Sequence, residues 1–303
     1  MPSDAHEQLV QAIVDNPPDP DASIDDLRAG FDAFLAAQPV PSGAAVEQVS
    51  LDGVPAERVS MPGADRDRVM LYLHGGGYAM GSAAGYRPFA ARLSEATSMP
   101  VVVPDYALAP ERRYPAAAED CLKAWRQLAA EDAEATAIAA DSGAVALMLA
   151  VLCAARDAGD PLPSVAIGLC PWADPGVGDT VAHHQDVGDP INTREGLRFF
   201  AAQYLDGEPA EGPAVNPLHA YLTGLPPLLL VAGTRDIGFP ATIALAARAR
   251  AAGVTTDVRA FHGLVHNFQL AAHLPEAADA VAAVAAFLSH HQNDATSVEE
   301  AAR

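Results

Sequence analysis

Short apolar runs alternate with polar turns along the chain and predict strands separated by helices. Buried strands are expected where such a run is bounded by turn residues, at 69–73, 136–139, 164–170, 226–232 and 255–261. An apolar, helix-favouring stretch follows the second of these at 145–155. Ser23-Ile24-Asp25-Asp26 resembles a capping box that opens another helix, and Leu51-Asp52-Gly53-Val54 predicts a hairpin between the first two strands. This alternation indicates an α/β fold.

The strand expected at 69–73 runs directly into His74-Gly75-Gly76-Gly77-Tyr78. A glycine inside regular structure costs roughly 0.5 to 1 kcal/mol, so three in a row indicate a backbone shape or a close approach that side chains would block. Consecutive glycines also present bare backbone N–H groups, which can hold the negatively charged oxygen that forms when a carbonyl is attacked. A plain glycine-rich turn is the alternative.

Ser142 lies between an expected strand and an expected helix, within Ala140-Asp141-Ser142-Gly143-Ala144. A serine hydroxyl is a weak nucleophile, so it needs an exposed position, a neighbouring base and N–H donors near the attacked carbonyl. A sharp turn supplies the exposure, and the N–H of Gly143 would face the same oxygen as the glycine loop. We therefore expect Ser142 to act as a nucleophile.

Two further strand ends carry the partners that such a serine requires. The strand at 226–232 leads to Asp236, which is well placed to orient a histidine, and the strand at 255–261 leads to His266, the expected base. The chain order Ser142, Asp236, His266 is that of the α/β hydrolases. Asp174, after the strand at 164–170, is the alternative acid, although its Pro-Trp context favours a structural turn.

Composition narrows the class of protein further. The 303 residues, of which 50% are apolar, are enough for one large core. A net charge of -21 and an isoelectric point near 4.6 argue against nucleic-acid binding, which requires a basic surface. We see no signal sequence and no apolar stretch long enough to span a bilayer, and the three cysteines are scattered. A cytoplasmic protein with reduced thiols and no membrane partner is therefore expected.

Several motifs together give the chain its resemblance to a known family. Besides the glycine loop they are Asp105-Tyr106-Ala107-Leu108-Ala109-Pro110-Glu111, Pro171-Trp172-Ala173-Asp174, Asp236 and Gly263-Leu264-Val265-His266. Over roughly residues 45–290 the chain resembles the hormone-sensitive-lipase-like (bacterial family IV) esterases of the α/β-hydrolase superfamily. In this family the segment with Asp105 and Glu111 resembles a structural brace, so neither is expected to act in catalysis.

The resemblance implies a fold, a site and a domain organisation. The fold is a mostly parallel eight-stranded sheet flanked by helices, as one domain over 1–303 with helical cap elements at about 1–40 and 181–216. The implied triad is Ser142, Asp236 and His266, with oxyanion donors at Gly76, Gly77 and Gly143. No cofactor is implied, and no Glu-x-x-His pattern supports a metal at His262 and His266. The tail from about residue 290 is predicted to be disordered.

The turn at the serine departs from the family pattern. The family has Gly-Asp-Ser-Ala-Gly-Gly, whereas this chain has Ala140-Asp141-Ser142-Gly143-Ala144-Val145 and no Gly-x-Ser-x-Gly at any position. Ala140 and Ala144 add one methyl group each, and we expect Gly143 to absorb the resulting strain through its backbone freedom. Asn267 stands where the family commonly has glycine. The resemblance therefore does not determine how wide the mouth of the pocket is.

These features predict a serine carboxylesterase that hydrolyses short-chain carboxylic esters through an acyl-enzyme, with a small-molecule ester as its partner. A lactone or aryl amide hydrolase with the same triad is the nearest alternative. A non-catalytic receptor for a small ligand is another, because a plant hormone receptor shares this fold but lacks the triad histidine. The physiological substrate, the stereochemical preference and the oligomeric state, a homodimer included, stay open.

Overall fold

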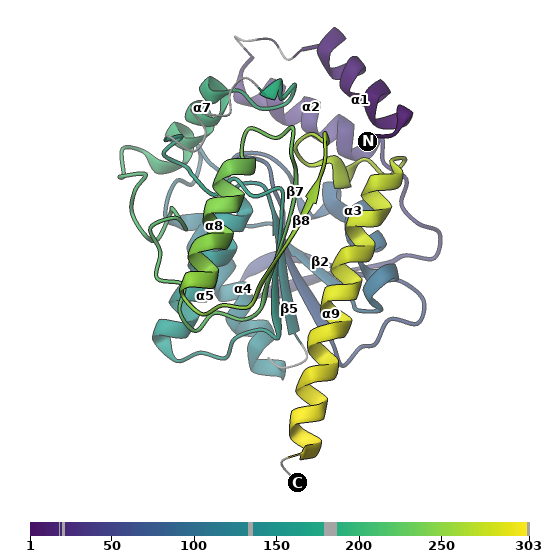
Figure 1. The fold of residues 1–303 in the computed structure, drawn as a ribbon, viewed down its shortest axis with the longest axis vertical. Coiled ribbons are helices and arrows are strands. Elements are labelled where there is room, and N and C mark those ends of the chain that lie inside the picture. Colours follow the sequence, from purple (N-terminus) through teal and green to yellow (C-terminus); the bar gives the residue numbers. More distant parts are fainter. Residues whose placement is uncertain (18, 20–21, 133–135, 179–186, 302–303) are drawn as a thin grey trace.

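The structure is a computed structural model that describes residues 1–17, 19, 22–132, 136–178 and 187–301. Within these residues eight strands form one sheet, in the order β1-β2-β4-β3-β5-β6-β7-β8 (Figure 1). The strands are β1 (Ala45–Leu51), β2 (Val54–Ser60), β3 (Val69–Leu73), β4 (Val101–Pro104), β5 (Thr136–Asp141), β6 (Val165–Leu169), β7 (Leu228–Gly233) and β8 (Thr256–Phe261). The helices are α1 (Asp4–Asp15), α2 (Ile24–Ala36), α3 (Ala83–Thr97), α4 (Ala116–Asp132), α5 (Ala144–Ala158), α7 (Arg194–Leu205), α8 (Phe239–Ala251), α9 (Pro275–Ala301) and the short 3-10 helix η2 (Phe268–Leu270).

The sheet is mostly parallel, as predicted. β1 and β2 form an antiparallel hairpin, and β2 pairs with β4 in the antiparallel sense. The hairpin turns at Asp52 and Gly53, whose φ angles of 50° and 84° suit a tight two-residue turn. All other neighbouring pairs, from β4 and β3 across to β8, are parallel. Parallel neighbours require crossover connections, which the helices between these strands supply.

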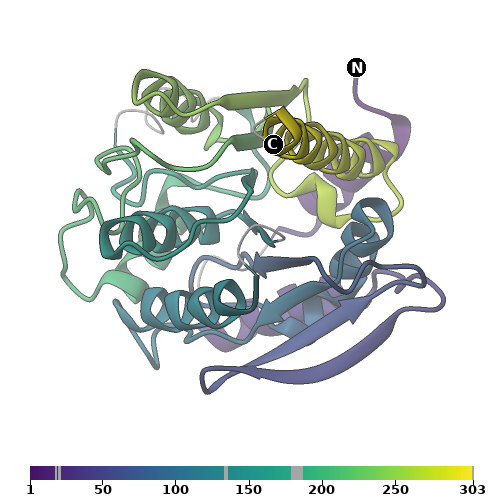
Figure 2. The same cartoon turned by 90° about the horizontal axis from the view of Figure 1, so that it is seen from below.

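Helices cover both faces of the sheet (Figure 2). α3 and α9 pack on one face, and α4, α5 and α8 pack on the other. Side chains alternate between the faces along each strand: in β3, Met70 and Tyr72 join the core that contains α3 and α9, whereas Leu71 and Leu73 join the core that contains α5. Burial on both faces explains why the central strands are continuous apolar runs in the sequence.

The loops that carry the predicted site meet at one edge of the sheet. β3, β5, β7 and β8 are parallel, so their carboxyl ends share that edge. The glycine loop follows β3, Ser142 follows β5, Asp236 follows β7 and His266 follows β8. α1, α2 and α7 gather at the same end of the molecule (Figure 1). In open α/β sheets this is the edge where ligands bind.

The segments predicted as a cap contain α1, α2 and α7. α2 begins at the capping box predicted from the sequence, in which Ser23 and Asp26 each accept the other's backbone N–H. Residues 181–186 of the second cap segment lie outside the described residues. α9 continues to Ala301, through the segment for which the sequence predicts disorder. The cap assignment and the disordered tail stay predictions. None of the helices in the described residues combines the length and apolar character needed to cross a membrane.

Candidate active site

Ser142 occupies the sharp turn between β5 and α5. Its φ of 55° lies in the left-handed region, which a serine adopts only when its surroundings impose it. Two backbone hydrogen bonds of 3.0 Å hold the turn, one from Ser142 N to Leu169 O and one from Trp172 N to Ser142 O. The hydroxyl is therefore held at the start of α5, where the polarity of the helix favours negative charge.

Ser142, His266 and Asp236 form one continuous chain of contacts. His266 Nε2 lies 2.9 Å from Ser142 Oγ, and His266 Nδ1 lies 2.6 Å from Asp236 Oδ2. Ser142, His266 and Asp236 are only 8%, 7% and 1% exposed. In this geometry the carboxylate accepts the Nδ1 proton, and Nε2 keeps the lone pair that can accept a proton from the serine.

The loops that carry the acid and the base hold each other in place. Arg235 N, beside the acid, donates to Leu264 O in the base loop at 3.0 Å. Gly238 N donates to Asp236 Oδ1 at 2.7 Å, so that the other carboxylate oxygen faces His266. The two loops form one backbone unit, and this unit sets the distance between carboxylate and imidazole.

The protonation of His266 is decided by two opposing effects. Burial alone lowers its pKa, because a charged imidazole is poorly solvated inside the protein. The charge of Asp236 and the hydrogen bond to it outweigh burial, and the pKa of His266 is raised above the ordinary value of 6.5. The imidazole is therefore a stronger base than a free histidine, and it becomes protonated at a higher pH.

Each glycine of the loop after β3 has a neighbour that excludes a side chain. A Cβ on Gly75 would overlap the carboxylate of Asp141, and one on Gly76 would overlap a backbone carbonyl of the same loop. Gly77 has a φ of 60°, and a Cβ there would lie 2.8 Å from the ring of Phe200. The prediction that close approach explains the glycine triplet is confirmed.

The predicted oxyanion donors are the amides of Gly76, Gly77 and Gly143. Within the described part of the chain, no residue accepts a hydrogen bond from any of the three. His74 braces the loop from behind, since its Nδ1 lies 2.9 Å from the carbonyl oxygen of the next residue and its ring stacks on Tyr106 at 4.3 Å. The loop is fixed while these N–H groups keep their donor capacity, as an oxyanion site requires.

A buried carboxylate, Asp141, joins the parts of the site. It accepts hydrogen bonds from the amide of Gly75 (2.7 Å), the hydroxyls of Tyr72 (2.7 Å) and Tyr86 (2.9 Å) and the side-chain amide of Asn267 (2.9 Å). Burial raises the pKa of Asp141, while the donors from Tyr72, Tyr86 and Gly75 favour its ionised form. Because this residue directly precedes the serine, the glycine loop, the serine turn and the base loop share one anchor.

Asn267 departs from the family glycine, and its side chain has a defined role in the structure. Its φ of 52° is left-handed, a conformation that asparagine tolerates better than most residues. The side chain donates to Asp141 and accepts from Gln269 Nε2 at 3.0 Å. Asn267 therefore ties the base loop to the shared anchor, a role that the sequence did not predict.

Gly143 does not supply the backbone freedom that the sequence predicts for it. Its φ and ψ of -61° and -28° are ordinary helical values, so it supplies no special backbone freedom and that prediction is wrong. The reason for glycine is space, because a Cβ here would lie 3.1 Å from the ring of Tyr78 and 3.3 Å from that of Trp172. Two aromatic rings close over the serine turn, and a larger residue would crowd them.

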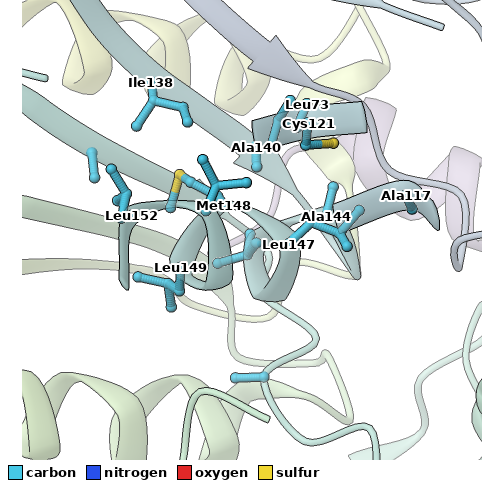
Figure 3. Packing of buried hydrophobic residues seen from close by; sticks show 14 of the residues in the cluster. Leu73, Ala117, Cys121, Ile138, Ala140, Ala144, Leu147, Met148, Leu149 and Leu152 are labelled. Atoms are coloured by element: carbon cyan, nitrogen blue, oxygen red, sulfur yellow. The ribbon is translucent and has the colours of Figure 1, made fainter. Parts of the chain in front are cut away.

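The alanines that flank the serine turn lie within apolar packing. Ala140 and Ala144 are both buried in the cluster around α5 (Figure 3). Opposite them, a Cβ on Gly168 of β6 would lie 3.0 Å from Val145 Cγ1. Gly168 therefore leaves the space that the side chain of Val145, at the start of α5, occupies against the sheet.

Aromatic side chains of α7 pack on the glycine loop and on the tyrosine that follows it. Phe200 packs against Gly77, and Tyr204 stacks on Tyr78 with the ring centroids 4.1 Å apart. The centroid of Trp172 lies 5.4 Å from that of Tyr78. Rings from the segment predicted as a cap therefore pack on the glycine loop and on Tyr78, and the ring of Tyr78 borders the serine turn at Gly143.

The other carboxylates considered in the sequence have structural partners. Asp174 accepts hydrogen bonds from Asn216 and from a turn amide, at 3.2 and 3.0 Å. Asp105 accepts the amide that begins α3, and Glu111 pairs with Arg28 of α2. These contacts agree with a turn for Asp174 and a brace for the other two. Of the acids considered, Asp236 is the one placed on His266.

Asp189, which the sequence analysis did not single out, links the segment before α7 to the acid loop. Its Oδ2 accepts from the amide of Ile237 at 3.0 Å, and its Oδ1 accepts from the amides of Ile191 and Asn192 at 2.9 and 3.1 Å. Burial and the nearby charge of Asp236 raise the pKa of Asp189. Asp189-Pro190 is a turn signal in the sequence, but nothing in that signal points to the acid loop.

No candidate metal centre is found where the structure describes the chain: no group of three or more His, Cys, Asp and Glu side chains there is arranged to hold an ion. His262 is exposed, whereas His266 is buried between Ser142 and Asp236. The three cysteines are free thiols.

Proteins similar to this chain include named hydrolases. A family model for the α/β hydrolase fold matches residues 70–270. LipR of Mycobacterium tuberculosis, which bears the provisional name of an acetyl-hydrolase, is 37% identical over 255 residues, covering 83% of this chain and 82% of that protein. An acetyl-hydrolase of Streptomyces hygroscopicus is 34% identical over 233 residues, covering 75% of this chain and 77% of that protein. The crystal structure of an esterase from the bacterial hormone-sensitive lipase family has a TM-score of 0.91 at 35% identity, covering 96% of this chain and 99% of that one.

The close packing over Gly143 predicts the effect of restoring the family's alanine. Gly143→Ala sets a methyl group against the ring of Tyr78 and should lower kcat/KM for a nitrophenyl ester, since overpacking costs about 1 to 3 kcal/mol. The loss should shrink in a Tyr78→Leu background but persist in an Ala140→Gly/Ala144→Gly background, because only the first removes the contact. Equal losses in all the backgrounds would contradict this packing account.

The bond between Asn267 and Asp141 predicts the effect of the family's glycine at position 267. Asn267→Gly keeps the left-handed backbone but removes the bond, so kcat should fall by about tenfold, because a hydrogen bond to a charged group contributes roughly 1.5 to 3 kcal/mol. Asn267→Asp, which sets a second carboxylate against the first, should lose more. Wild-type kcat in the glycine variant would mean that Asn267 serves only the backbone conformation.

Proposed function

The chain belongs to the α/β hydrolase fold family and to its hormone-sensitive-lipase-like esterases, and we propose that this carboxylic ester hydrolase works through an acyl-enzyme on Ser142. The observation that carries the proposal is the contact from Ser142 through His266 to Asp236, at 2.9 and 2.6 Å. A serine in contact with a buried histidine, which is itself held by a carboxylate, has the activation that acyl transfer requires.

In the proposed reaction, Ser142 Oγ attacks the ester carbonyl while His266 Nε2 takes the hydroxyl proton. The amides of the glycine loop and of the residue after the serine stabilise the oxyanion. His266 then gives the proton to the leaving alcohol as the ester C–O bond breaks, and the acyl group stays on the serine. Water removes it by the same route, while Asp236 keeps the imidazole in one tautomer.

Small acyl groups suit the surroundings of the nucleophile best. Phe200 packs on the glycine loop and Tyr204 stacks on Tyr78, so rings of α7 lie against the proposed oxyanion loop, and the serine itself is only 8% exposed. Two of the similar proteins carry the name acetyl-hydrolase, which supports a short acyl chain here. Short-chain carboxylic esters are therefore the proposed substrate class.

The same triad would serve a lactone or aryl amide hydrolase, so these substrates belong in the test. A non-catalytic receptor is disfavoured by His266, whose two ring nitrogens face Ser142 and Asp236. The proposed reaction uses no metal or cofactor. A cytoplasmic location and the exclusion of nucleic acids and membranes as partners stay predictions from the sequence, and the oligomeric state, a homodimer included, stays open.

Substitutions in the triad test the mechanism. Ser142→Ala, Asp236→Asn and His266→Ala should each lower kcat by orders of magnitude, because the three groups act as a unit, with the smallest loss for Asp236→Asn. The assay is a panel of nitrophenyl esters of graded acyl length, with lactones and anilides added. Asp174→Asn is the matched control and should keep near-normal turnover. Loss in Asp174→Asn with full rate in Asp236→Asn would refute the acid assignment, and no turnover of any substrate by wild type would favour a receptor.

The pH profile tests the base. Protonated His266 cannot accept the serine proton, and Asp236 raises its pKa, so kcat/KM should fall on the acid side with an apparent pKa above 6.5. Asp236→Asn removes the charge that raises the pKa of His266, so the fall of kcat/KM on the acid side should move to lower pH. A wild-type profile that stays flat down to about pH 4.5 is incompatible with a histidine base.

A further inference from the structure

The backbone amide of Val265, one residue before the proposed base, is bonded to a side chain from the opposite end of the chain. Val265 is fully buried, and its N–H donates to Nε2 of His6 in α1, with 3.3 Å between the two nitrogens. His6 is also completely buried. A buried backbone N–H without an acceptor is costly, so this contact helps to hold the backbone on which His266 stands.

Other contacts fix the start of α1 beside the base loop. Pro2 lies so close to Gly263 that a Cβ there would come within 2.7 Å of its ring. Ser3 donates to Glu276 of α9 through its backbone N at 2.6 Å and its Oγ at 3.0 Å. Ser3 Oγ also accepts the backbone N–H of His6 at 3.2 Å. The imidazole is therefore carried by a helix end that is anchored to both the base loop and α9.

Only a neutral imidazole can accept from Val265, because Nε2 must offer its lone pair. The proton then resides on Nδ1, which lies 3.7 Å from Glu7 Oε1. Burial lowers the pKa of His6 and Arg235 lowers it further, whereas Glu7 and Glu276 act to raise it. Protonation of Nε2 would set one N–H against another and remove the acceptor.

We propose that His6 is a positioning residue for the base: by holding the amide of Val265, it keeps Nε2 of His266 aligned with Ser142. The proposal rests on the proposed function, in which His266 is the general base. It gives α1 a part in positioning the base. The competing explanation is that α1 docks by apolar packing alone, through side chains such as Val10, and that His6 only fills space.

Three variants separate these explanations. His6→Leu removes the acceptor, His6→Gln restores one through its side-chain oxygen, and Val10→Ala weakens the apolar docking of the same helix at a residue that is 6% exposed. We expect His6→Leu to lower kcat about tenfold with KM within about twofold of wild type. His6→Gln should recover most of this loss, and Val10→Ala should lower the melting temperature while kcat is kept. Unchanged kcat in His6→Leu would overturn the proposal. So would a loss of kcat in His6→Gln equal to that in His6→Leu, or an equal loss in all three variants.

Hydrogen exchange adds a measurement that does not depend on turnover. The peptide that covers residues 262–268 should exchange its amides faster in His6→Leu than in wild type, and at the wild-type rate in His6→Gln. The same difference should appear when Ser142→Ala is added to each protein. If the proposed function is wrong, Ser142→Ala will keep full ester turnover. If the positioning role of His6 is wrong, the amides of residues 262–268 will exchange in His6→Leu at the wild-type rate.

The fall of kcat/KM at acid pH gives a second test, because a His6 that only filled space would not change its steepness. In wild type, protonation of His6 should steepen the fall of kcat/KM below the pH at which His266 is protonated, because the pKa of His6 is lowered and that of His266 is raised. His6→Gln carries no titratable group there and should show the loss from a single proton only. Equal steepening in both proteins would contradict the role of His6.

Discussion

The buried carboxylate of Asp141 is the constraint on which the rest of the site depends. It accepts four hydrogen bonds, from the glycine loop, from Tyr72, from Tyr86 and from Asn267 beyond the histidine. Each buried donor left without this acceptor would cost about 1 to 3 kcal/mol, so the donors and the carboxylate fix one another. The nucleophile is the next residue along the chain, and its place relative to the glycine loop and the base therefore follows from a single anchor.

The remaining segments of the site attach to the loops around this anchor. The acid and base loops share the backbone hydrogen bond from Arg235 to Leu264. Asp189, before α7, accepts the amide beside the acid, and His6, in α1, accepts the amide beside the base. The segments at the carboxyl edge are thus connected to the backbone of the acid and base loops, and the rings of Phe200 and Tyr204 pack on the glycine loop and on Tyr78.

Local patterns predicted the parts of the molecule that depend on local forces. β3 begins at Val69 and ends at Leu73 as the apolar run indicates, and the strand ends carry Ser142, Asp236 and His266 to a common edge. Contacts between distant segments could not be predicted in this way. Gly143 is required by rings from two other loops, not by its own backbone, and the donor and acceptor of the His6 contact are separated by 259 positions in the chain. Neither constraint leaves a pattern within one stretch of sequence.

The central claim is that the acyl group is carried by Ser142, and covalent labelling tests it most directly. The protein would be treated with a sulfonyl fluoride, or rapidly quenched during turnover of a nitrophenyl ester, and the adduct located by peptide mass spectrometry. We expect a single adduct on the peptide that contains Ser142, no adduct in Ser142→Ala, and much slower labelling in His266→Ala. An adduct on another residue, or equal labelling of Ser142→Ala, would contradict it.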